Sequence, residues 1–383
     1  MHSFTLWRMT SPRLSDITGI INKKYPFTLA EQWDNVGLQI GAPSDQITNI
    51  MVALDPLPAV LDEAITRGCN LLVTHHPLIF SPIRQINSST IVGNSILKSI
   101  QGGLAIVSMH TNYDIAQDGL NDVLAEQLDL EATRPLKILH YDDLVKLIVF
   151  VPSAQLEAVR SALFVHTVPI GNYRNCTFAT TGQGTFLPLT GAQPAIGTIG
   201  MLEQVQEERL ELLIQKSRLT KAIKTLLSVH PYEEPAFDCY PLLNESMPVG
   251  LGRVGRLPEP LTLQAYSSYI AARLGCRSVR LVGAPDRLIH KVALCSGSGA
   301  SLIADAVRAG ADLLVTGDIK YHEARDAETQ GIALLDAGHF ATEQLMVTAI
   351  QRFLATELKD AGYQTEVYAS TAEHDPFITV MHA

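Results

Sequence analysis

In the segment "LVTHHPL", His75 and His76 stand side by side directly after an apolar run. Imidazole nitrogens are common ligands of transition metals. Adjacent side chains diverge in an extended chain, so this pair suits two different metal ions better than chelation of one. The alternative is a strand end capped by two partly exposed imidazoles, and the pair alone does not decide between these interpretations.

Two further segments separate a histidine from a carboxylate by three residues. "HTNYD" contains His110 and Asp114, and "GHFATE" contains His339 and Glu343. On a helix that begins near Gly338, the second pair projects from one face. Taken alone, the first pair also fits an exposed turn and the second a helix-start cap. Nitrogen and oxygen ligands together suit Zn, Mn, Fe or Co, and the lack of cysteine ligands favours a catalytic site.

An internal repeat indicates how these residues are positioned. Residues 51–76 resemble residues 291–318, and both read as strand, helix and a second strand "LLVT". A third strand follows in each half and leads to the histidine and carboxylate. We therefore expect an α/β fold of two similar lobes with mostly parallel sheets. Ligands of such sheets gather beyond the carboxyl ends of the strands, which favours a shared metal site.

The segment between the lobes has a different pattern, with elements in the order β-α-β-β-α-β. This order predicts an inserted ferredoxin-like α+β domain. The expected domains are a first metal-binding lobe at 1–137, the insert at 138–244 and a second metal-binding lobe at 245–383. Within the insert, "VHPYEEPAF" fits a rigid turn or an interface.

Several motifs could contact a substrate. The connection "CSGSGAS" could offer backbone amides to an anion at a helix N-terminus, although any tight strand-to-helix connection uses such residues. Asp318 and His322 follow the second "LLVT" and should approach the same cleft, His322 either as a general acid or base or as polar lining. "WDNVGLQIG" reads as a cleft wall or a packed turn. The residues of the glycine-rich connection are Ser296, Gly297, Ser298 and Gly299.

Composition excludes several classes of protein. The chain has 383 residues, 46% of them hydrophobic, and a formal charge of -10, which argues against broad nucleic-acid binding. Five cysteines without C-x-x-C spacing indicate neither a disulfide framework nor a thiolate site, so we expect a reducing, cytoplasmic compartment. No apolar stretch is long enough to span a membrane, and the N-terminus lacks a secretory signal. Met1 and Met9 both fit as the start.

The motifs "THHPLIF", "HTNYD", "CSGSGAS", "TGDIKYH" and "GHFATE", in this order, resemble the Nif-three-like family of dinuclear metal-centre proteins, the GTP cyclohydrolase I type 2 homologues. The resemblance covers essentially the whole chain. It implies two divalent transition-metal ions per chain, Zn, Mn or Fe. The ligands that it implies are His75, His76, Asp114, His339 and Glu343.

The resemblance also carries expectations about function. It implies a homohexamer and a hydrolase for a small molecule such as a nucleotide, one that opens the guanine ring of GTP and releases formate. His322 or His110 would give a proton to the departing ring nitrogen, since imidazole can exchange protons near neutral pH. The loop 296–299 would hold the triphosphate. The alternatives are a metal-stabilised hexamer that binds protein partners without turnover, and a hydrolase of another nucleotide or phosphoester.

Overall fold

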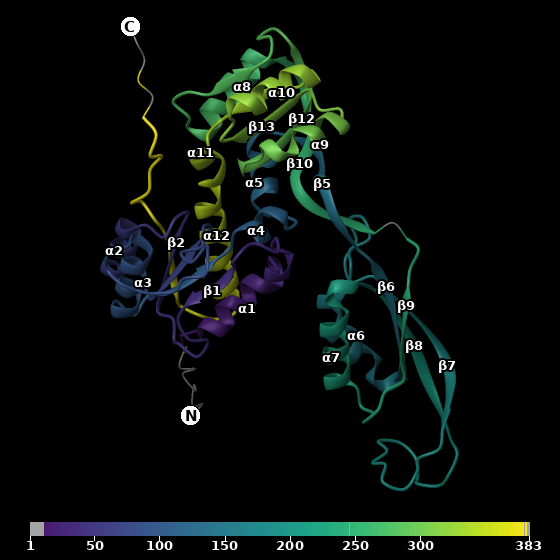
Figure 1. The fold of residues 1–383 in the computed structure, drawn as a ribbon. Coiled ribbons are helices and arrows are strands. Elements are labelled where there is room, and N and C mark those ends of the chain that lie inside the picture. The colour runs from purple at the N-terminus through teal and green to yellow at the C-terminus, as the bar shows by residue number, and fades with distance from the viewer. Residues whose placement is uncertain (1–10, 245, 379, 381–383) are drawn as a thin grey trace, which may run out of the picture. The chain divides into compact units, whose positions relative to one another are not determined.

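The computed structural model describes residues 11–244, 246–378 and 380, shown as a ribbon in Figure 1. The chain forms two compact units, which we call unit 1 (Met1–Leu139 with Val249–Ala383) and unit 2 (His140–Pro248). Among the described residues, no helix is both long and apolar enough to cross a membrane. The two expected starts, Met1 and Met9, lie outside the described residues.

The first sheet of unit 1 is mostly parallel, as the repeat predicts. Its strands, in spatial order, are β1 (Gly37–Ile40), β4 (Ala105–Ser108), β3 (Leu71–Thr74), β2 (Asn49–Ala53) and β15 (Glu366–Ala369). β1 runs antiparallel to β4, and the other three pairs are parallel. The register pairs Thr74 with both Ala53 and Ser108, so β2, β3 and β4 end level with one another.

The second sheet of unit 1 has a parallel centre with antiparallel flanks. Its strands, in spatial order, are β11 (Arg280–Val282), β14 (Ala333–Asp336), β13 (Leu313–Gly317), β12 (Leu288–Ser298), β10 (Met247–Thr262) and β5 (Glu131–Asp142). β12, β13 and β14 are parallel, while β10 and β11 run antiparallel to their neighbours β12 and β14. Ser298 pairs with Gly317, and Thr316 with Asp336, so these strand ends also lie together.

Helices cover both faces of each sheet in unit 1. α1 and α12 pack on one face of the first sheet, and α2 and α3 on the other. α5 and α8 cover one face of the second sheet, and α9 and α10 the other. Burial on both faces explains why the central strands are apolar along their length. The helices are α1 (Leu14–Lys24), α2 (Pro58–Thr66), α3 (Ile91–Gln101), α4 (Thr111–Ile115), α5 (Leu120–Gln127), α8 (Leu263–Leu274), α9 (Ile303–Arg308), α10 (Tyr321–Gln330), α11 (His339–Glu343) and α12 (Leu345–Asp360).

The two sheets are not built from two separate halves of the sequence. β15 lies at the edge of the first sheet, and Val367 joins its core. Conversely, Leu124 and Leu128 belong to the N-terminal half of the sequence but pack in the core of the second sheet. The expected lobes at 1–137 and 245–383 therefore exchange elements. Periodicity shows that a short strand forms, but it does not show which sheet the strand joins.

Unit 2 has one antiparallel sheet with two helices on one face. Its spatial strand order is β7-β8-β6-β9. α6 and α7 bury Val159, Leu163 and Leu226 against β6 and β8. In chain order the elements are β6 (Leu144–Pro152), α6 (Leu156–Leu163), β7 (Thr177–Phe186), β8 (Glu203–Gln215), α7 (Leu219–Val229) and β9 (Phe237–Pro241).

Candidate metal centre

His75 and His76 leave the carboxyl end of β3. The Thr74 hydroxyl stabilises this turn, because it donates to the carbonyl of His76 at 2.8 Å and lies 3.1 Å from the Ser108 hydroxyl. The amides of both histidines donate to the carbonyl of Leu54, at 3.2 and 2.9 Å. The His75 side chain is fully buried, and its ring centroid lies 5.1 Å from that of His76.

The end of β4 and the short helix α4 contribute His110 and Asp114. The Nδ1–H of His110 donates to Asp34 Oδ1 at 2.9 Å, and its ring centroid lies 5.1 Å from that of His75. Asp114 is buried, and Ser296 donates a hydrogen bond to it at 3.2 Å. Asp114 Oδ1 also lies 3.8 Å from His75 Nε2.

α11 follows the end of β14 and presents His339 and Glu343 from one face. The i, i+4 spacing places His339 Nε2 2.9 Å from Glu343 Oε2. Gly297 allows the Glu343 carboxylate to approach the backbone, because a Cβ atom there would lie 2.1 Å from Oε1. Its φ of 62° also lies in the left-handed region that favours glycine.

Glu343 lies among three histidine rings. Its Oε1 is 3.6 Å from His75 Nε2, and its Oε2 is 3.1 Å from His76 Nε2. The Nε2 atoms of His76 and His339 are 3.4 Å apart. Two groups of ligand atoms within 4.8 Å of one another result among the described residues: His76, His339 and Glu343, and His75, His76 and His110. Side chains that follow strands of both sheets thus converge on one cluster.

Each histidine of this cluster is oriented by an acceptor at its Nδ1 atom. A proton held on Nδ1 leaves Nε2 free to ligate a metal, the usual arrangement of metal-binding histidines. The acceptors are the Met109 carbonyl for His75 (2.8 Å), Asp55 for His76 (2.7 Å), Asp34 for His110 (2.9 Å) and Asp318 for His339 (2.7 Å).

Asp55 and Glu373, which lie around the cluster, were not predicted from the sequence. Asp55 lies just beyond β2, and the strand-end rule that selected His75 would also have selected it. Glu373 accepts hydrogen bonds from the amides of Leu54 and Asp55, at 2.8 and 2.6 Å. Glu373 is 319 positions from Leu54 and carries no local signal. Asp318 does contact the cluster, as its position after the second "LLVT" predicts.

The carboxylates around the cluster favour positive charge on its histidines. Burial lowers the pKa of His76, but its hydrogen bonds with Asp55 and Glu343 raise it to about 10. The hydrogen bond with Glu343 raises the pKa of His339 to about 9. Burial also lowers the pKa of His75, and the nearby carboxylates of Asp114 and Glu343 raise it overall. The cluster is therefore a site that attracts cations.

The pKa values of the carboxyl groups show the same coupling. Burial raises the pKa of Glu343, but the histidines beside it hold the pKa well below its usual range. Burial raises the pKa of Asp114 more than the neighbouring histidines lower it. For Asp34, burial raises the pKa, while the hydrogen bonds from His110 and Thr111 lower it to about 2. Asp34 is thus a charged anchor for the His110 ring.

The donor set fits bound metal ions. His75 Nε2 and Glu343 Oε2 are buried, and while each histidine of the cluster carries its only proton on Nδ1, neither atom has a hydrogen-bond partner within the described part of the chain. An unpaired buried polar atom is costly, and coordination to a cation would satisfy both atoms. Imidazole nitrogen and carboxylate oxygen without thiolate suit Zn, Mn or Fe.

The glycine-rich connection supports the cluster instead of offering its amides to an anion. The amide of Ser296 donates to Asn121, that of Gly297 to Thr342 and that of Gly299 to Thr316. β12 continues through Ser298, and the helix α9 that follows has only six residues. The expected role of Ser296, Gly297, Ser298 and Gly299 as a phosphate site therefore does not match these contacts. The partners lie elsewhere in the sequence, so the motif alone could not reveal them.

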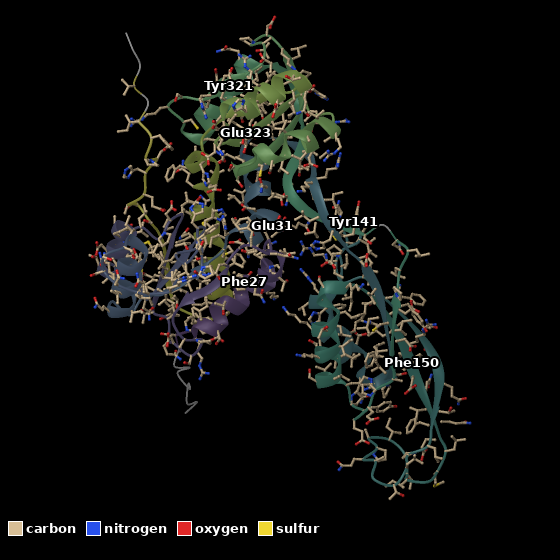
Figure 2. The ribbon with its side chains drawn as sticks, in the orientation of Figure 1. Phe27, Glu31, Tyr141, Phe150, Tyr321 and Glu323 are labelled. Carbon is tan, nitrogen blue, oxygen red and sulfur yellow. The ribbon has the colours of Figure 1, made fainter. Side chains whose placement is uncertain are left out.

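His322 differs from His110 in its surroundings. It lies at the start of α10 between Tyr321 and Glu323, which Figure 2 labels, and it is exposed. The Tyr321 ring contacts it, with centroids 5.4 Å apart. His322 belongs to neither group of close ligand atoms in the described chain, whereas His110 belongs to one. The geometry thus favours His110 of the two expected proton donors.

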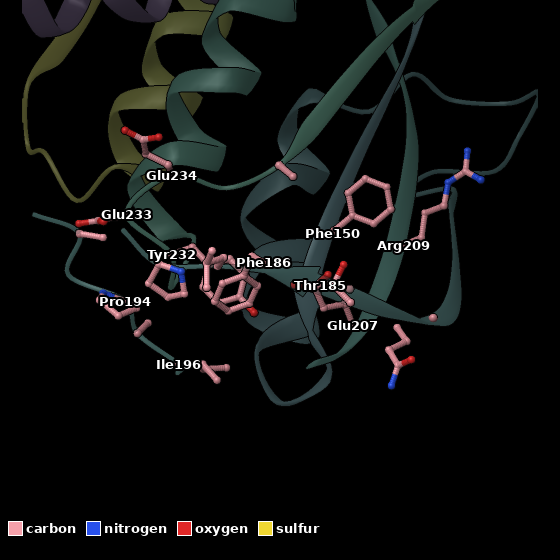
Figure 3. A pocket seen from close by; sticks show the side chains of 18 of the residues that line it. Phe150, Thr185, Phe186, Pro194, Ile196, Glu207, Arg209, Tyr232, Glu233 and Glu234 are labelled. Atoms are coloured by element: carbon pink, nitrogen blue, oxygen red, sulfur yellow. The ribbon is translucent and has the colours of Figure 1, made fainter. Parts of the chain in front are cut away.

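A cavity of about 730 Å³ lies in unit 2, lined by residues between Phe150 and Ala236 (Figure 3). Its labelled residues include the carboxylates Glu207 and Glu233 and the aromatic rings of Phe186 and Tyr232. All candidate metal ligands belong to unit 1 instead. The segment "VHPYEEPAF" forms a turn beside this cavity, held by hydrogen bonds of His230 to the carbonyl of Phe150 and the amide of Tyr232.

Comparisons with known proteins give matches along most of the chain. The sequence profile of Duf34/NIF3 (NGG1p interacting factor 3) matches residues 12–376. A GTP cyclohydrolase 1 type 2 homolog of Halalkalibacterium halodurans is 40% identical over 353 residues, 92% of this chain and 95% of that protein. The protein of the same name from Bacillus subtilis is also 40% identical, over 92% and 94%. A crystal structure of a Bacillus cereus protein related to NIF3 has a TM-score of 0.87 at 39% identity and covers 96% of this chain and 99% of its own.

Proposed function

Because this chain belongs to the Duf34/NIF3 family, we propose that it is a dinuclear metal-dependent hydrolase that opens the guanine ring of GTP and releases formate. The name of its relatives, GTP cyclohydrolase 1 type 2 homolog, supports the substrate. The position of Glu343 is the observation that supports two metal ions. Its two oxygens face different histidines, as the oxygens of a bridging carboxylate do.

Two sets of ligands would share Glu343. His75, Asp114 and Oε1 would hold one divalent ion, and His76, His339 and Oε2 the other. Such ions lower the pKa of water and stabilise the negative charge that develops during hydrolysis. Asp55 and Asp318, together with the Met109 carbonyl, would keep the three ligating imidazoles in place.

His110 would transfer the proton that ring opening requires. Asp34 holds its Nδ1, so the Nε2 side can exchange a proton with a substrate beside the cluster. Removal of C8 as formate consumes two water molecules. The first adds at C8 and breaks one C8–N bond, and the departing ring nitrogen takes the proton from His110. The second hydrolyses the resulting formamide and leaves an amine and formate.

An assay of formate tests this proposal. The full chain is loaded with Zn or Mn and incubated with GTP, and formate is measured with a coupled dehydrogenase. We expect turnover in the wild type, none in His76→Ala, and slowed turnover at unchanged metal content in His110→Gln. His322→Ala should retain most activity, and the exposed Asp326→Asn serves as a control.

The other outcomes separate the alternatives. Formate that persists in His76→Ala would indicate a contaminating enzyme. A strong loss in His322→Ala at full metal content would assign the proton transfer to that residue. A fully metallated wild type without formate would exclude the proposed reaction, and a screen of other nucleotides and phosphoesters would then distinguish another hydrolase from a binding protein without turnover.

The proposal includes a homohexamer, on the resemblance to the family. Light scattering of the full chain should give a mass near six times the 41.7 kDa of one chain. A monomeric mass at micromolar concentration would contradict this part of the proposal and leave the metal centre untouched.

A further inference from the structure

Two exposed aromatic rings lie beside the metal centre. The side chains of Trp33 and Phe80 are 59% and 53% exposed, and their ring centroids are 5.8 Å apart. Both rings contact His110, at centroid distances of 5.9 and 6.4 Å. The ring centroid of His110 in turn lies 5.1 Å from that of His75, so Trp33 and Phe80 border the ligand cluster. We call the pair Trp33 and Phe80 the aromatic wall.

The backbone of Trp33 is fixed by its neighbour. The Asp34 side chain is fully buried and accepts hydrogen bonds from His110 and from the Thr111 amide, at 2.9 and 3.0 Å. The amide of Glu31, which Figure 2 labels, donates to the Thr111 hydroxyl at 3.0 Å. Trp33 therefore belongs to the same anchored segment that orients His110.

Phe80 is held in the same way through the residue before it. The carbonyl of Ile79 accepts a hydrogen bond from Asn35 at 2.6 Å, and its amide donates to Gln39 at 3.2 Å. The segments that carry the two rings are thus tied to each other. The wall is built before any ligand arrives, which reduces the entropic cost of binding.

The exposure of this wall calls for an explanation. Single exposed apolar side chains are common, but two aromatic rings in contact beside a polar cluster are typical of a ligand site. Aromatic faces bind flat rings by stacking, and nucleobases stack on them regardless of sequence.

We propose that the aromatic wall is the subsite for the purine base, and that it presents the edge of the base to His110 and the metal centre. The inference rests on the proposed function, because that function requires a purine whose C8 faces the cluster. The His110 ring stands at 77° to Trp33 and 69° to Phe80. Because the two rings are tilted by 54° to each other, a base stacks on Trp33 and meets Phe80 at an angle. Such a base meets the imidazole at a steep angle, where its edge and not its face approaches the proton donor.

The charges near the wall fit recognition of the base over its phosphates. The carboxylates of Asp34, Asp55 and Asp318 lie around the ligand cluster. Within the described chain, they contact histidines, hydroxyls and backbone amides. Carboxylates around the cluster disfavour phosphate groups, so most of the binding free energy should come from the ring system. Guanosine monophosphate should therefore bind nearly as well as the triphosphate.

The fluorescence of Trp33 provides a direct test. The sequence contains two tryptophans, so Trp7→Phe leaves Trp33 as the only tryptophan of the full chain, which can be excited at wavelengths that the tyrosines do not absorb. In zinc-loaded protein we expect guanosine monophosphate to quench this fluorescence to saturation, whereas ribose 5-phosphate should neither quench nor compete. In the wild-type background, Trp33→Ala should weaken binding of guanosine monophosphate by roughly 5- to 150-fold in calorimetry, at unchanged zinc content.

Matched variants separate stacking from damage to the fold. Trp33→Phe keeps a stacking ring and should recover most of the affinity. Tyr173→Ala removes an exposed aromatic ring of unit 2 and should change nothing. Equal binding of the nucleotide by wild type and Trp33→Ala would overturn the inference, as would quenching by ribose 5-phosphate.

The subsite and the reaction can fail separately. If wild type releases no formate while guanosine monophosphate still quenches Trp33, the subsite stands and the proposed reaction fails. If formate is released and the KM for GTP is the same in Trp33→Ala, the reaction stands and the subsite is wrong. An increase in KM with nearly unchanged kcat supports both.

Discussion

Glu343 and His110 differ in their expected importance for metal binding. Glu343 contacts three histidines and would be shared by both ions, whereas His110 is anchored to Asp34 and would serve the substrate. We therefore expect Glu343→Ala to reduce metal content from about two ions to less than one, as expected when a two-metal site loses a shared ligand. The His110→Ala variant should keep a metal content of about two ions per chain.

Elemental analysis after dialysis against trace zinc measures this difference. Circular dichroism controls for folding. Equal losses in the two variants would assign His110 to the ligand set, where its proximity to His75 and His76 also places it within reach.

Metal binding should release protons. In the metal-free protein the pKa values of His76 and His339 are raised to about 10 and about 9, so both rings are protonated near pH 7.5. A metal requires neutral imidazoles, so loading should release about two protons and metal affinity should rise with pH up to about 10. Without metal, the stability that these protons confer is present at neutral pH and lost as the pH rises through 9 to 10.

Calorimetry in two buffers of different ionisation enthalpy counts these protons. An observed heat that is the same in both buffers would show that the histidines are already neutral. Asp326→Asn, at an exposed position of α10 that belongs to neither group of close ligand atoms, should release as many protons as the wild type.

The residues of the centre were only partly predictable from sequence. His75, His76, Asp114, His339 and Glu343 follow strand ends of a repeat, and parallel strands bring such ends together. The role of Asp34 was left open between a wall and a turn, because a hydrogen bond to His110 depends on tertiary structure. The same limitation applies to the loop 296–299, because the sequence does not show that the amides of Ser296, Gly297 and Gly299 donate to distant side chains.

Among the elements, the segment after β15 contacts residues that position the cluster. Glu63 on α2 accepts hydrogen bonds from Ser370 and Thr371, at 2.7 and 3.0 Å. Glu373 then holds the turn after β2, including Asp55, which orients His76. Through Asp55, this segment thus influences the orientation of His76, a candidate metal ligand.

Glu373→Gln should weaken metal binding although it touches no ligand. The amide group replaces one acceptor with a donor that faces the amide of Leu54 or Asp55, so the turn shifts and His76 loses its orientation. Outer partners of metal-binding histidines typically contribute about 10- to 100-fold in affinity, and we expect the lower end of that range. Competition with a chromogenic chelator measures the change.

Glu366→Gln provides the control for this segment, since Glu366 is exposed on β15. It should match the wild type. If Glu373→Gln also matches the wild type, the turn that carries Asp55 is rigid without the segment.

The existence of the elements was easier to predict than their partners. The strands β2, β3, β12 and β13 follow directly from the repeat, and the two strands of each copy pair in parallel, as expected for a mostly parallel sheet. β15 was missed as a partner of β2, because four residues carry too little pattern to select a sheet. Long helices such as α12 are evident from apolar spacing, yet that spacing does not reveal the first sheet as their partner.

At the scale of the whole molecule, unit 1 should fold without unit 2. β5 and β10 connect the units, and they lie close together: a Cβ atom on Gly250 would be 2.0 Å from the Lys137 carbonyl oxygen. We predict that replacing residues 139–248 with Asn-Gly closes a hairpin between these strands. The product should be soluble and bind as much metal as the full chain.

Gel filtration, circular dichroism and elemental analysis check this deletion. Glu343→Ala in the shortened chain is the control for specific binding. Aggregation or loss of metal in the shortened protein would mean that unit 2 is needed for the fold of unit 1.

The placement of β15 and Glu373 has a consequence for synthesis on the ribosome. The strand β2 and the turn at Leu54 are translated early, but β15 and Glu373, which complete them, are translated much later, Glu373 319 positions after Leu54. Domains otherwise tend to fold in order from the N-terminus. Here the first sheet is completed and His76 is oriented only after residues 366–373 have been made, so a chain truncated before Glu366 should be a poor competitor for cellular metal and a ready substrate for proteases.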